Sequence, residues 1–362
     1  MYALVDCNNF YASCERVFNP NLQHKPVAIL SNNDGCVISM SDEAKDLELP
    51  FGAPIFKWDV FCKANNISVL SSNYPLYGDM SARVMKILEQ FSPNIEVYSI
   101  DEAFLELKGF ENYNFSEYAT IIRSRVLKWT GIPTCVGIAP TKALSKVANK
   151  IARFDIKKTG GICVIDTEEK RIKALKWTSL KKVWGIGSRL SKRLAVKGCK
   201  TAWDFTQLSD QWVLKNFSIT ELKLKKELEG IPKIELESVV SSKKTIATTR
   251  SFESTFSDID NIKERVSTFA VSCAEKLRKQ HSSCHMIIVL LSSDRHKKES
   301  EQHKASKTVV FPCPTDSSLS ISNAAINAVK SMFKKGIKYK RAGVIITGLV
   351  PTDNHQLDLF LH

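Results

Sequence analysis

In the first half of the chain, short apolar runs that end in acidic or turn residues alternate with segments of helical periodicity. Apolar strands are predicted at residues 2–6, 25–30, 36–40, 134–138 and 159–165. Helices are predicted at residues 10–17, 41–45, 80–90, 118–129 and 141–152. Because these elements alternate irregularly around a hairpin, the pattern favours an α+β fold over a doubly wound parallel sheet.

The hairpin is predicted around two adjacent carboxylates, Asp101 and Glu102, which interrupt an apolar run at residues 95–107. The flanks mirror each other, with Tyr98 and Phe104 innermost, so Asp101 should lie near the tip. A bend is required, because neighbours on a regular strand point to opposite faces. The local sequence alone leaves a functional site and an exposed acidic turn equally open.

Two basic segments follow the first half of the chain. Residues 168–181 are predicted to form a basic helix, and a turn at Gly185 and Gly187 leads to a second helix ending at residue 197. Such a helix-hairpin-helix can offer backbone N–H groups and a helix N-terminus to a phosphate. The alternative is an ordinary pair of antiparallel helices.

The last third of the chain has a regular order of elements after a linker at residues 238–242. Strand, helix, strand, strand, helix and strand are predicted at residues 245–252, 259–280, 285–291, 307–311, 320–335 and 342–349. This β-α-β-β-α-β order is typical of a small ferredoxin-like domain. The apolar residues of the tail should pack on the protein itself or bind the groove of a partner.

The distribution of charge indicates a polyanionic partner. The chain has 362 residues and a net charge of +14. Residues 1–169 have a net charge of −3, whereas residues 243–350 have a net charge of +10. Residues 170–200 hold 11 basic side chains and no acidic one. Nucleic acid is favoured over a merely solvated basic surface.

Other features argue against a secreted, zinc-binding or membrane protein. The ten cysteines show no Cys-x-x-Cys pairs, so they are predicted to be reduced core residues. No apolar run reaches membrane-spanning length, and the N-terminus does not resemble a signal segment. A cytoplasmic protein without a membrane partner is therefore expected.

Asp6 ends the first predicted strand, so it could meet Asp101 and Glu102 across neighbouring strands. Such carboxylates can hold two Mg²⁺ ions about 3.5–4 Å apart, and oxygen ligands favour Mg²⁺ over zinc. Together with the basic segments, they indicate phosphoryl or nucleotidyl transfer on nucleic acid. On this evidence a polymerase and a nuclease remain comparable.

Several motifs resemble those of a known family. Asp-Cys-Asn-Asn-Phe-Tyr-Ala at 6–12, Ser-Ile-Asp-Glu-Ala-Phe at 99–104 and Val-Gly-Ile-Ala at 136–139 resemble the palm motifs of Y-family translesion DNA polymerases. Residues 31–37, 72–74, 183–187 and the terminal Gln-Leu-Asp-Leu-Phe are similar to the UmuC-type branch, the catalytic subunit of bacterial DNA polymerase V. The resemblance covers nearly the whole chain.

The resemblance implies an error-prone, template-directed DNA polymerase that performs translesion synthesis in the SOS response. It implies a right-hand fold with a palm, small fingers, a helix-hairpin-helix thumb, a linker, a little finger and a tail. The corresponding residues are 1–25 and 75–167, 26–74, 168–237, 238–242, 243–350 and 351–362. The rivals are a DNA-binding scaffold that has kept the polymerase shape without activity, and a metal-dependent nuclease.

The resemblance also implies roles for individual residues. Asp6, Asp101 and Glu102 become catalytic metal ligands for two Mg²⁺ ions, joined by the backbone carbonyl of Cys7. Tyr11 becomes the steric gate that excludes a 2′-hydroxyl.

Ser41 and Ala44 stand where many members have a tyrosine and an arginine that hold the triphosphate, so the nucleotide contacts are reassigned. The candidates are Phe10, Arg153, Lys157 and Lys158.

The resemblance also implies contacts with larger partners. The residues implied to contact the DNA backbone are Gly185, Gly187 and Arg189. The clamp-binding peptide is Gln356, Leu357, Asp358, Leu359 and Phe360. The implied partners are primer–template DNA, deoxynucleoside triphosphates, the sliding clamp, a processed UmuD dimer and RecA.

Overall fold

The computed structural model describes residues 1–237, 242–294 and 302–352. The chain divides into two compact units, Met1–Val239 and Val240–His362. The boundary falls inside the segment predicted as a linker, and each unit is described by itself.

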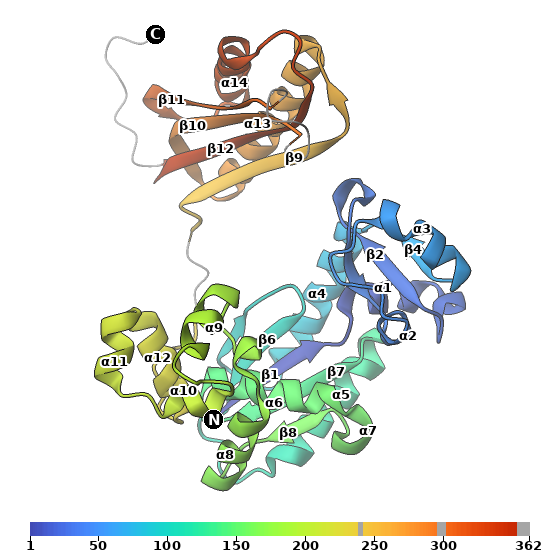
Figure 1. Ribbon diagram of the computed structural model, residues 1–362, viewed down its shortest axis with the longest axis vertical. Coiled ribbons are helices and arrows are strands. Elements are labelled where there is room, and N and C mark those ends of the chain that lie inside the picture. The colour runs from blue at the N-terminus through green and yellow to red at the C-terminus, as the bar shows by residue number, and fades with distance from the viewer. Residues whose placement is uncertain (238–241, 295–301, 353–362) are drawn as a thin grey trace. The chain divides into compact units, whose positions relative to one another are not determined.

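The first unit is built on a five-stranded sheet with the order β5-β6-β1-β7-β8. Its strands are β1 (Tyr2–Cys7), β5 (Ile95–Val97), β6 (Glu102–Glu106), β7 (Thr134–Ala139) and β8 (Ile162–Val164). The first strand, β1, is antiparallel to both β6 and β7, and only β7 and β8 are parallel. The sheet is therefore mixed, and the predicted α+β class is confirmed (Figure 1).

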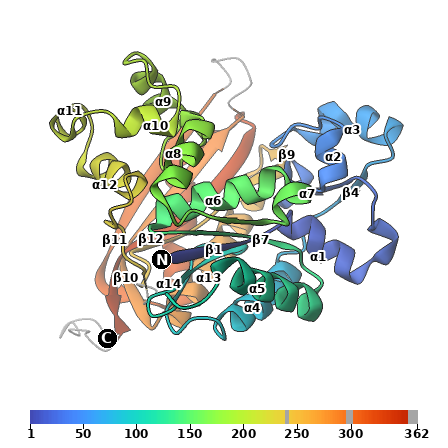
Figure 2. The same ribbon diagram turned by 90° about the horizontal axis from the view of Figure 1, so that it is seen from below.

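Helices cover both faces of this sheet (Figure 2). On one face lie α1 (Phe10–Phe18), α4 (Tyr74–Leu88) and α5 (Phe115–Thr130), and on the other lies α6 (Lys142–Phe154). Since side chains alternate along β1, Val5 and Cys7 pack into the core beneath the first three helices. Leu4 and Asp6 point toward α6, where both line the same cavity as residues of that helix.

Helix α6 lies directly on the backbone of the sheet. A Cβ atom on Gly137 would stand 2.1 Å from the backbone nitrogen of Asn149 and 2.4 Å from the carbonyl oxygen of Ser145. The side-chain amide of Asn149 donates hydrogen bonds to the carbonyls of Leu4, at 3.3 Å, and Cys135, at 2.9 Å. This contact explains the glycine of the Val-Gly-Ile-Ala motif, because no other residue allows so close an approach.

A smaller lobe of the first unit has its own sheet and core, and appears in blue at the right of Figure 1. It consists of β2 (Val27–Leu30), β3 (Val37–Met40), α2 (Asp42–Asp46), α3 (Ile55–Ala64) and β4 (Ser68–Leu70). The sequence predicts β2, β3 and α2 but misses α3 and β4. Buried residues of α3 and of the β2–β3 pair form a cluster that is separate from the main core.

The fourth helix, α4, begins earlier than its sequence predicts. It starts at Tyr74, whereas the apolar pattern places the helix at residues 80–90. The side chain of Asn73 caps the helix by accepting a hydrogen bond from the N–H of Leu76 at 3.2 Å. Pro75 lies in the first turn, where proline is tolerated because its missing N–H has no helical partner.

The helices after β8 form a further lobe. They are α8 (Glu168–Trp177), α9 (Ser188–Ala195), α10 (Ala202–Thr206), α11 (Asp210–Asn216) and α12 (Ile219–Leu228), whereas the short α7 (Ile156–Thr159) lies between α6 and β8. The predicted basic helix at 168–181 is α8 followed by a separate 3₁₀ turn, Leu180–Lys182. The glycine turn then leads into α9, and Gly185 has a φ of 81°, which strongly favours glycine.

Two buried carboxylates hold the segment that leaves this lobe. Glu227 is fully buried and accepts hydrogen bonds from the backbone N–H groups of Ile234, at 2.9 Å, and Ala143, at 3.1 Å. Glu96 of β5 accepts a hydrogen bond from the N–H of Glu237 at 2.9 Å. The chain is thus fixed to the first unit up to Glu237.

The second unit confirms the predicted β-α-β-β-α-β order. Its elements are β9 (Thr245–Phe256), α13 (Ile259–Lys279), β10 (Ser282–Ser293), β11 (Lys304–Thr315), α14 (Ser318–Met332) and β12 (Tyr339–Pro351). The sheet order is β11-β10-β12-β9, so the second and fourth strands are central, where the usual ferredoxin order centres the first and third. Both helices pack on one face, and within the described residues of this unit no helix covers the other face.

Two expectations about the whole chain can be compared with the structure. All ten cysteines are free thiols, and most are buried. Within the described residues, no helix combines the length and the apolar character needed to cross a membrane.

The close contact of α6 with β7 gives a stability prediction. Gly137→Ala should destabilise the first unit by about 2–3 kcal/mol, because the new methyl group meets backbone atoms that cannot move aside. Thermal unfolding measures this loss. The control is Gly78→Ala inside α4, where an added Cβ would meet no atom within 4 Å beyond the adjacent backbone of its own helix, so alanine should be neutral or stabilising by up to about 1 kcal/mol. Equal melting temperatures for both variants would contradict the packing described above.

Candidate active site

Two of the predicted catalytic carboxylates are neighbours across the sheet. Asp6 of β1 is paired directly with Glu102 of β6, so both side chains lie on the face covered by α6. Both line a cavity of about 490 Å³, together with residues of α6 and of the 3₁₀ turn. The third carboxylate, Asp101, immediately precedes β6, and its carbonyl accepts a hydrogen bond from the N–H of Cys7 at 2.8 Å.

The hairpin that presents these acids is formed by β5 and β6. The strands pair Val97 with Ala103, so Ile100 lies at the centre of the turn and Asp101 one residue later. The N–H groups of Tyr98 and Ser99 both point to the carbonyl of Glu102, at 3.1 Å, and close the turn. This bend brings the charges of both acids within range of Asp6.

The three carboxylates repel one another. The pKa of Asp6 is raised to about 7 by burial first and then by the charges of Glu102 and Asp101. Arg153 and Lys146 lower the pKa of Asp6 in part. A cluster that holds a proton at neutral pH gains from a cation, so the donor set suits a hard divalent metal.

The carboxylates do not form a finished metal site in this conformation. Glu102 accepts a hydrogen bond from Lys146 Nζ at 2.7 Å, and Asp101 accepts one from the Ser99 hydroxyl at 2.5 Å. Within the described part of the chain, no three His, Cys, Asp or Glu side chains are gathered closely enough to hold a metal. The side chain of Cys7 is buried in the core, so only its backbone can serve at this edge.

Tyr11 is held at the start of α1 by other rings. It stacks on Tyr77, with ring centroids 4.3 Å apart and an interplanar angle of 15°, and meets the ring of Tyr74 edge-on. Burial, Tyr74 and then Asp101 raise the pKa of the Tyr11 hydroxyl. The adjacent Phe10 is 4% exposed, so only its backbone is available to a nucleotide.

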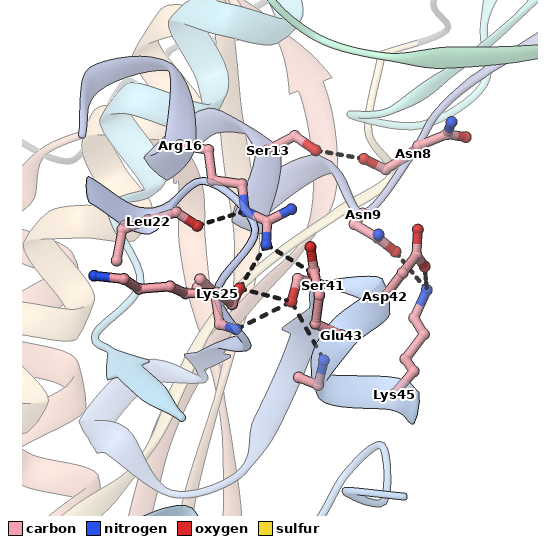
Figure 3. A network of polar contacts seen from close by, with 12 residues as sticks. Asn8, Asn9, Ser13, Arg16, Leu22, Lys25, Ser41, Asp42, Glu43 and Lys45 are labelled. Carbon is pink, nitrogen blue, oxygen red and sulfur yellow. Dashed lines mark hydrogen bonds and ion pairs between the residues drawn. The ribbon is translucent and has the colours of Figure 1, made fainter. Parts of the chain in front are cut away.

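Two cations meet beside the start of α1. Arg153 donates hydrogen bonds to Asp42, at 2.7 Å, and to the side-chain oxygen of Asn9, at 3.0 Å. Lys45 donates to the same two partners, and Figure 3 shows its side chain with those of Asn9 and Asp42. Burial would raise the pKa of Asp42, but the hydrogen bond with Asn9 and the charges of Arg153 and Lys45 lower it.

The residues at the positions matched to the usual triphosphate pair do not reach the cations around Asn9. Ser41 and Ala44 are fully buried, and the Ser41 hydroxyl accepts a hydrogen bond from the N–H of Val27 at 3.0 Å (Figure 3). The residues one position later, Asp42 and Lys45, carry their side chains to the network around Asn9. Ser41 caps α2, so its side chain turns back to the backbone N–H of Ala44.

The remaining nucleotide candidates lie elsewhere. Lys157 and Lys158 are exposed on α7, and neither lines the cavity of Asp6. Lys158 pairs with Asp155 at 3.2 Å and borders a second cavity of about 430 Å³ beside Phe154. Of the predicted nucleotide-binding side chains, only Arg153 is brought to the carboxylates.

The glycine turn directly follows residues that line the same cavity. Gly187 directly precedes α9, and Arg189 is exposed on its first turn. The neighbouring Trp184 lines the cavity, and its indole N–H donates a hydrogen bond to the Tyr98 hydroxyl at 3.0 Å. The predicted clamp peptide, Gln356 to Phe360, lies outside the described residues.

Lys146 and Lys45 are the site residues that the sequence predictions missed. The signal for Lys146 in the sequence is a set of three lysines on α6, Lys142, Lys146 and Lys150, which are spaced four residues apart. That spacing places them on one face. Only the order of strands in the sheet reveals that this face lies over the acids.

Comparison with known proteins places the chain in a family. A model described as the impB/mucB/samB family matches residues 5–150, and the model of that family's C-terminal domain matches residues 243–359. Protein UmuC of Salmonella typhimurium is 38% identical over 99% of this chain and 86% of its own length. The chain belongs to the impB/mucB/samB family.

Other proteins similar to this chain are named as polymerases. DNA polymerase IV of Bacillus velezensis is 25% identical over 98% of this chain and 84% of its own length. A solved structure titled as a Y-family DNA polymerase chimera matches with a TM-score of 0.78 and 23% identity, covering 97% of this chain and 99% of the other. This impB/mucB/samB protein therefore has the right-hand fold of a Y-family DNA polymerase.

The raised pKa of Asp6 gives a prediction for the metal-free protein. Between its ordinary value of 3.8 and about 7, the folded state keeps a proton on Asp6 that the unfolded state has lost. The contribution of Asp6 to stability should therefore fall as pH rises through this window, by about 2–4 kcal/mol. Denaturant unfolding at pH 5 and pH 8 with a chelator should show this slope. Asp6→Asn should flatten it, and Asp79→Asn, at an exposed carboxylate of α4, should leave it unchanged.

Proposed function

We propose that this protein is a template-directed DNA polymerase that performs error-prone translesion synthesis in the SOS response. The observation that carries the proposal is the direct pairing of Asp6 with Glu102 beside a cation-lined cavity, in a chain of this family. A binding scaffold has no need of such a pair. The small sheet lobe, at residues 26–74, forms fingers that enclose the nascent base pair loosely and so tolerate damaged templates.

The carboxylates would hold two Mg²⁺ ions, with Asp6, Asp101, Glu102 and the carbonyl of Cys7 as ligands. Bound Mg²⁺ neutralises the phosphates and favours ionisation of the attacking hydroxyl. Burial and then repulsion from Glu102 and Asp101 raise the pKa of Asp6, and the repulsion supports this assignment because a cation relieves it. Glu102 must exchange its bond to Lys146 for the metal.

The triphosphate would lie at the N-terminus of α1, where free N–H groups and the helix dipole favour an anion. Arg153 and Lys45 are the cations of this subsite, and they would exchange Asp42 for phosphate oxygens. Tyr11 would lie under the sugar, with its ring fixed by Tyr77.

DNA would be bound by both units. In the thumb, at residues 168–237, the turn at Gly185 and Gly187 offers N–H groups to the backbone, with Arg189 beside it. In the little finger, at residues 243–350, we propose that the uncovered sheet face lies against the duplex. The solved relative titled as an insertion ternary complex of Dbh DNA polymerase, with a TM-score of 0.61, shares the fold.

The other partners are proposed from the resemblance. The tail, with Gln356 to Phe360, would bind the sliding clamp, and a processed UmuD dimer and RecA would regulate synthesis. Palm residues 1–25 and 75–167 and the linker at 238–242 complete the proposed domains. We propose that the protein acts in the cytoplasm, where these partners and the DNA are found.

Primer extension on undamaged and abasic-site templates tests the activity. Asp101→Ala should lower the rate at least about a thousandfold, because metal-assisted charge stabilisation is lost. Binding of primer–template DNA should be retained, which separates catalysis from folding. Wild-type extension by Asp101→Ala would refute the catalytic role. Mg²⁺-dependent cleavage of labelled DNA without nucleotides would favour the nuclease instead.

Selection of the sugar tests the steric gate. Tyr11→Ala should raise ribonucleotide incorporation relative to deoxyribonucleotides by roughly 10- to 100-fold, because the space under the 2′ position is opened. Tyr11→Phe keeps the ring on Tyr77 and should keep the discrimination. Single-nucleotide incorporation kinetics measure both ratios. Unchanged sugar selectivity in Tyr11→Ala would refute the steric gate and leave the Tyr11 ring with a packing role in the core only.

A further inference from the structure

Lys146 is enclosed by aromatic rings beside the catalytic carboxylates. Its Nζ atom lies 2.7 Å from a carboxylate oxygen of Glu102 and 4.2 Å from the ring centroid of Tyr98. The rings of Phe104 and Trp184 are each 5.5 Å away. The Lys146 side chain is only 15% exposed. A desolvated ammonium over several rings is stabilised by cation–π attraction and keeps a strong bond to its carboxylate.

The walls of this enclosure come from two separate elements. Tyr98 and Phe104 belong to the hairpin that carries Glu102, whereas Trp184 belongs to the glycine turn before α9. Trp184 meets the Tyr98 ring edge-on, at a centroid distance of 5.8 Å, and donates its indole N–H to the Tyr98 hydroxyl. The turn and the hairpin therefore close over the same lysine.

We propose that Lys146 is a positioning residue that holds the Glu102 carboxylate until a divalent cation competes for it, and that Trp184 sets the strength of this hold. The inference rests on the proposed metal-binding role of Asp6 and Glu102. The metal must displace an ammonium that is already bonded to its ligand, and it also approaches against a like charge. Losing the Trp184 ring exposes Lys146 to water and weakens its bond to Glu102.

This arrangement links the glycine turn to the metal site. Trp184 directly precedes Gly185, so phosphate bound at Gly185 and Gly187 would shift the position of the Trp184 ring. A shift of that ring would in turn change the bond between Lys146 and Glu102. Coupling between two binding events is reciprocal, so divalent cation should also change the affinity for DNA.

The test is binding of Mn²⁺ to the full chain without DNA or nucleotide, measured from the electron paramagnetic resonance signal of the free ion. Lys146→Met should bind Mn²⁺ about tenfold more tightly than the wild type, because the competing ammonium is gone. Lys146→Arg keeps the charge and should stay within about threefold of the wild type. The matched control is Lys150→Met, since Lys150 lines the same cavity but donates to the carbonyl of Lys182 at 2.9 Å.

A double-mutant cycle tests the part of Trp184. Trp184→Leu should tighten Mn²⁺ binding about threefold in the wild-type background. It should have no effect in the Lys146→Met background, because Trp184 acts through the bond between Lys146 and Glu102, which Lys146→Met has already removed. Trp177→Leu, at a ring paired with Phe154 and outside the lining of the Asp6 cavity, should have no effect in either background.

The outcomes separate this inference from the proposed function. If wild-type protein binds Mn²⁺ and Asp6→Asn does not, the metal site stands. Equal affinities for Lys146→Met and Lys150→Met would then overturn the role of Lys146, and additive effects in the cycle would overturn that of Trp184. Failure of the wild type to bind Mn²⁺ would overturn the metal site and this inference together.

Discussion

The candidate site depends on the contact between one helix and two strands. Gly137 lets α6 lie on the backbone of β7, and Asn149 fastens the helix to carbonyls of β1 and β7. With any side chain at Gly137, the helix would stand farther from the sheet. Lys146 and Arg153 would then move away from Asp6, and the balance of charge over the sheet would be lost.

That balance is close, because two carboxylates at or near the cavity are already paired with cations. Glu102 is bonded to Lys146, and Asp42 is bonded to Arg153 and Lys45. Among the described residues Asp6 has no ion pair as close as these, and burial and the neighbouring acids raise its pKa to about 7. In the proposed function, substrate and metal would exchange with existing pairs, so the cost of desolvating these charges would already have been met in folding.

Most helices and strands and the positions of the acids could be predicted from the sequence, but the contacts between elements could not. Asp6 and the Asp101–Glu102 pair could be predicted, because carboxylates at strand ends are visible in an apolar pattern. The early start of α4 was missed because Pro75 and Gly78 resemble a loop until Asn73 is seen as a cap.

The pairing of Lys146 with Glu102 could not be predicted, because it depends on β6 lying beside β1 and α6 lying across both. In the second unit the order of elements was recoverable from periodicity. Which strands are central was not, because local patterns do not record pairing between distant strands.

The two buried carboxylates at the exit of the first unit have a consequence for DNA binding as a whole. Because Glu227 and Glu96 hold the chain as far as Glu237 and β9 begins at Thr245, few residues of sequence join the two units. Two DNA-binding bodies joined by a short connection multiply their affinities, since binding by one raises the local concentration of the other. If both units bind DNA as proposed, anchoring the exit segment therefore raises the avidity of the whole chain for DNA. Releasing the segment would lengthen the connection and lower this avidity without changing any contact to the duplex.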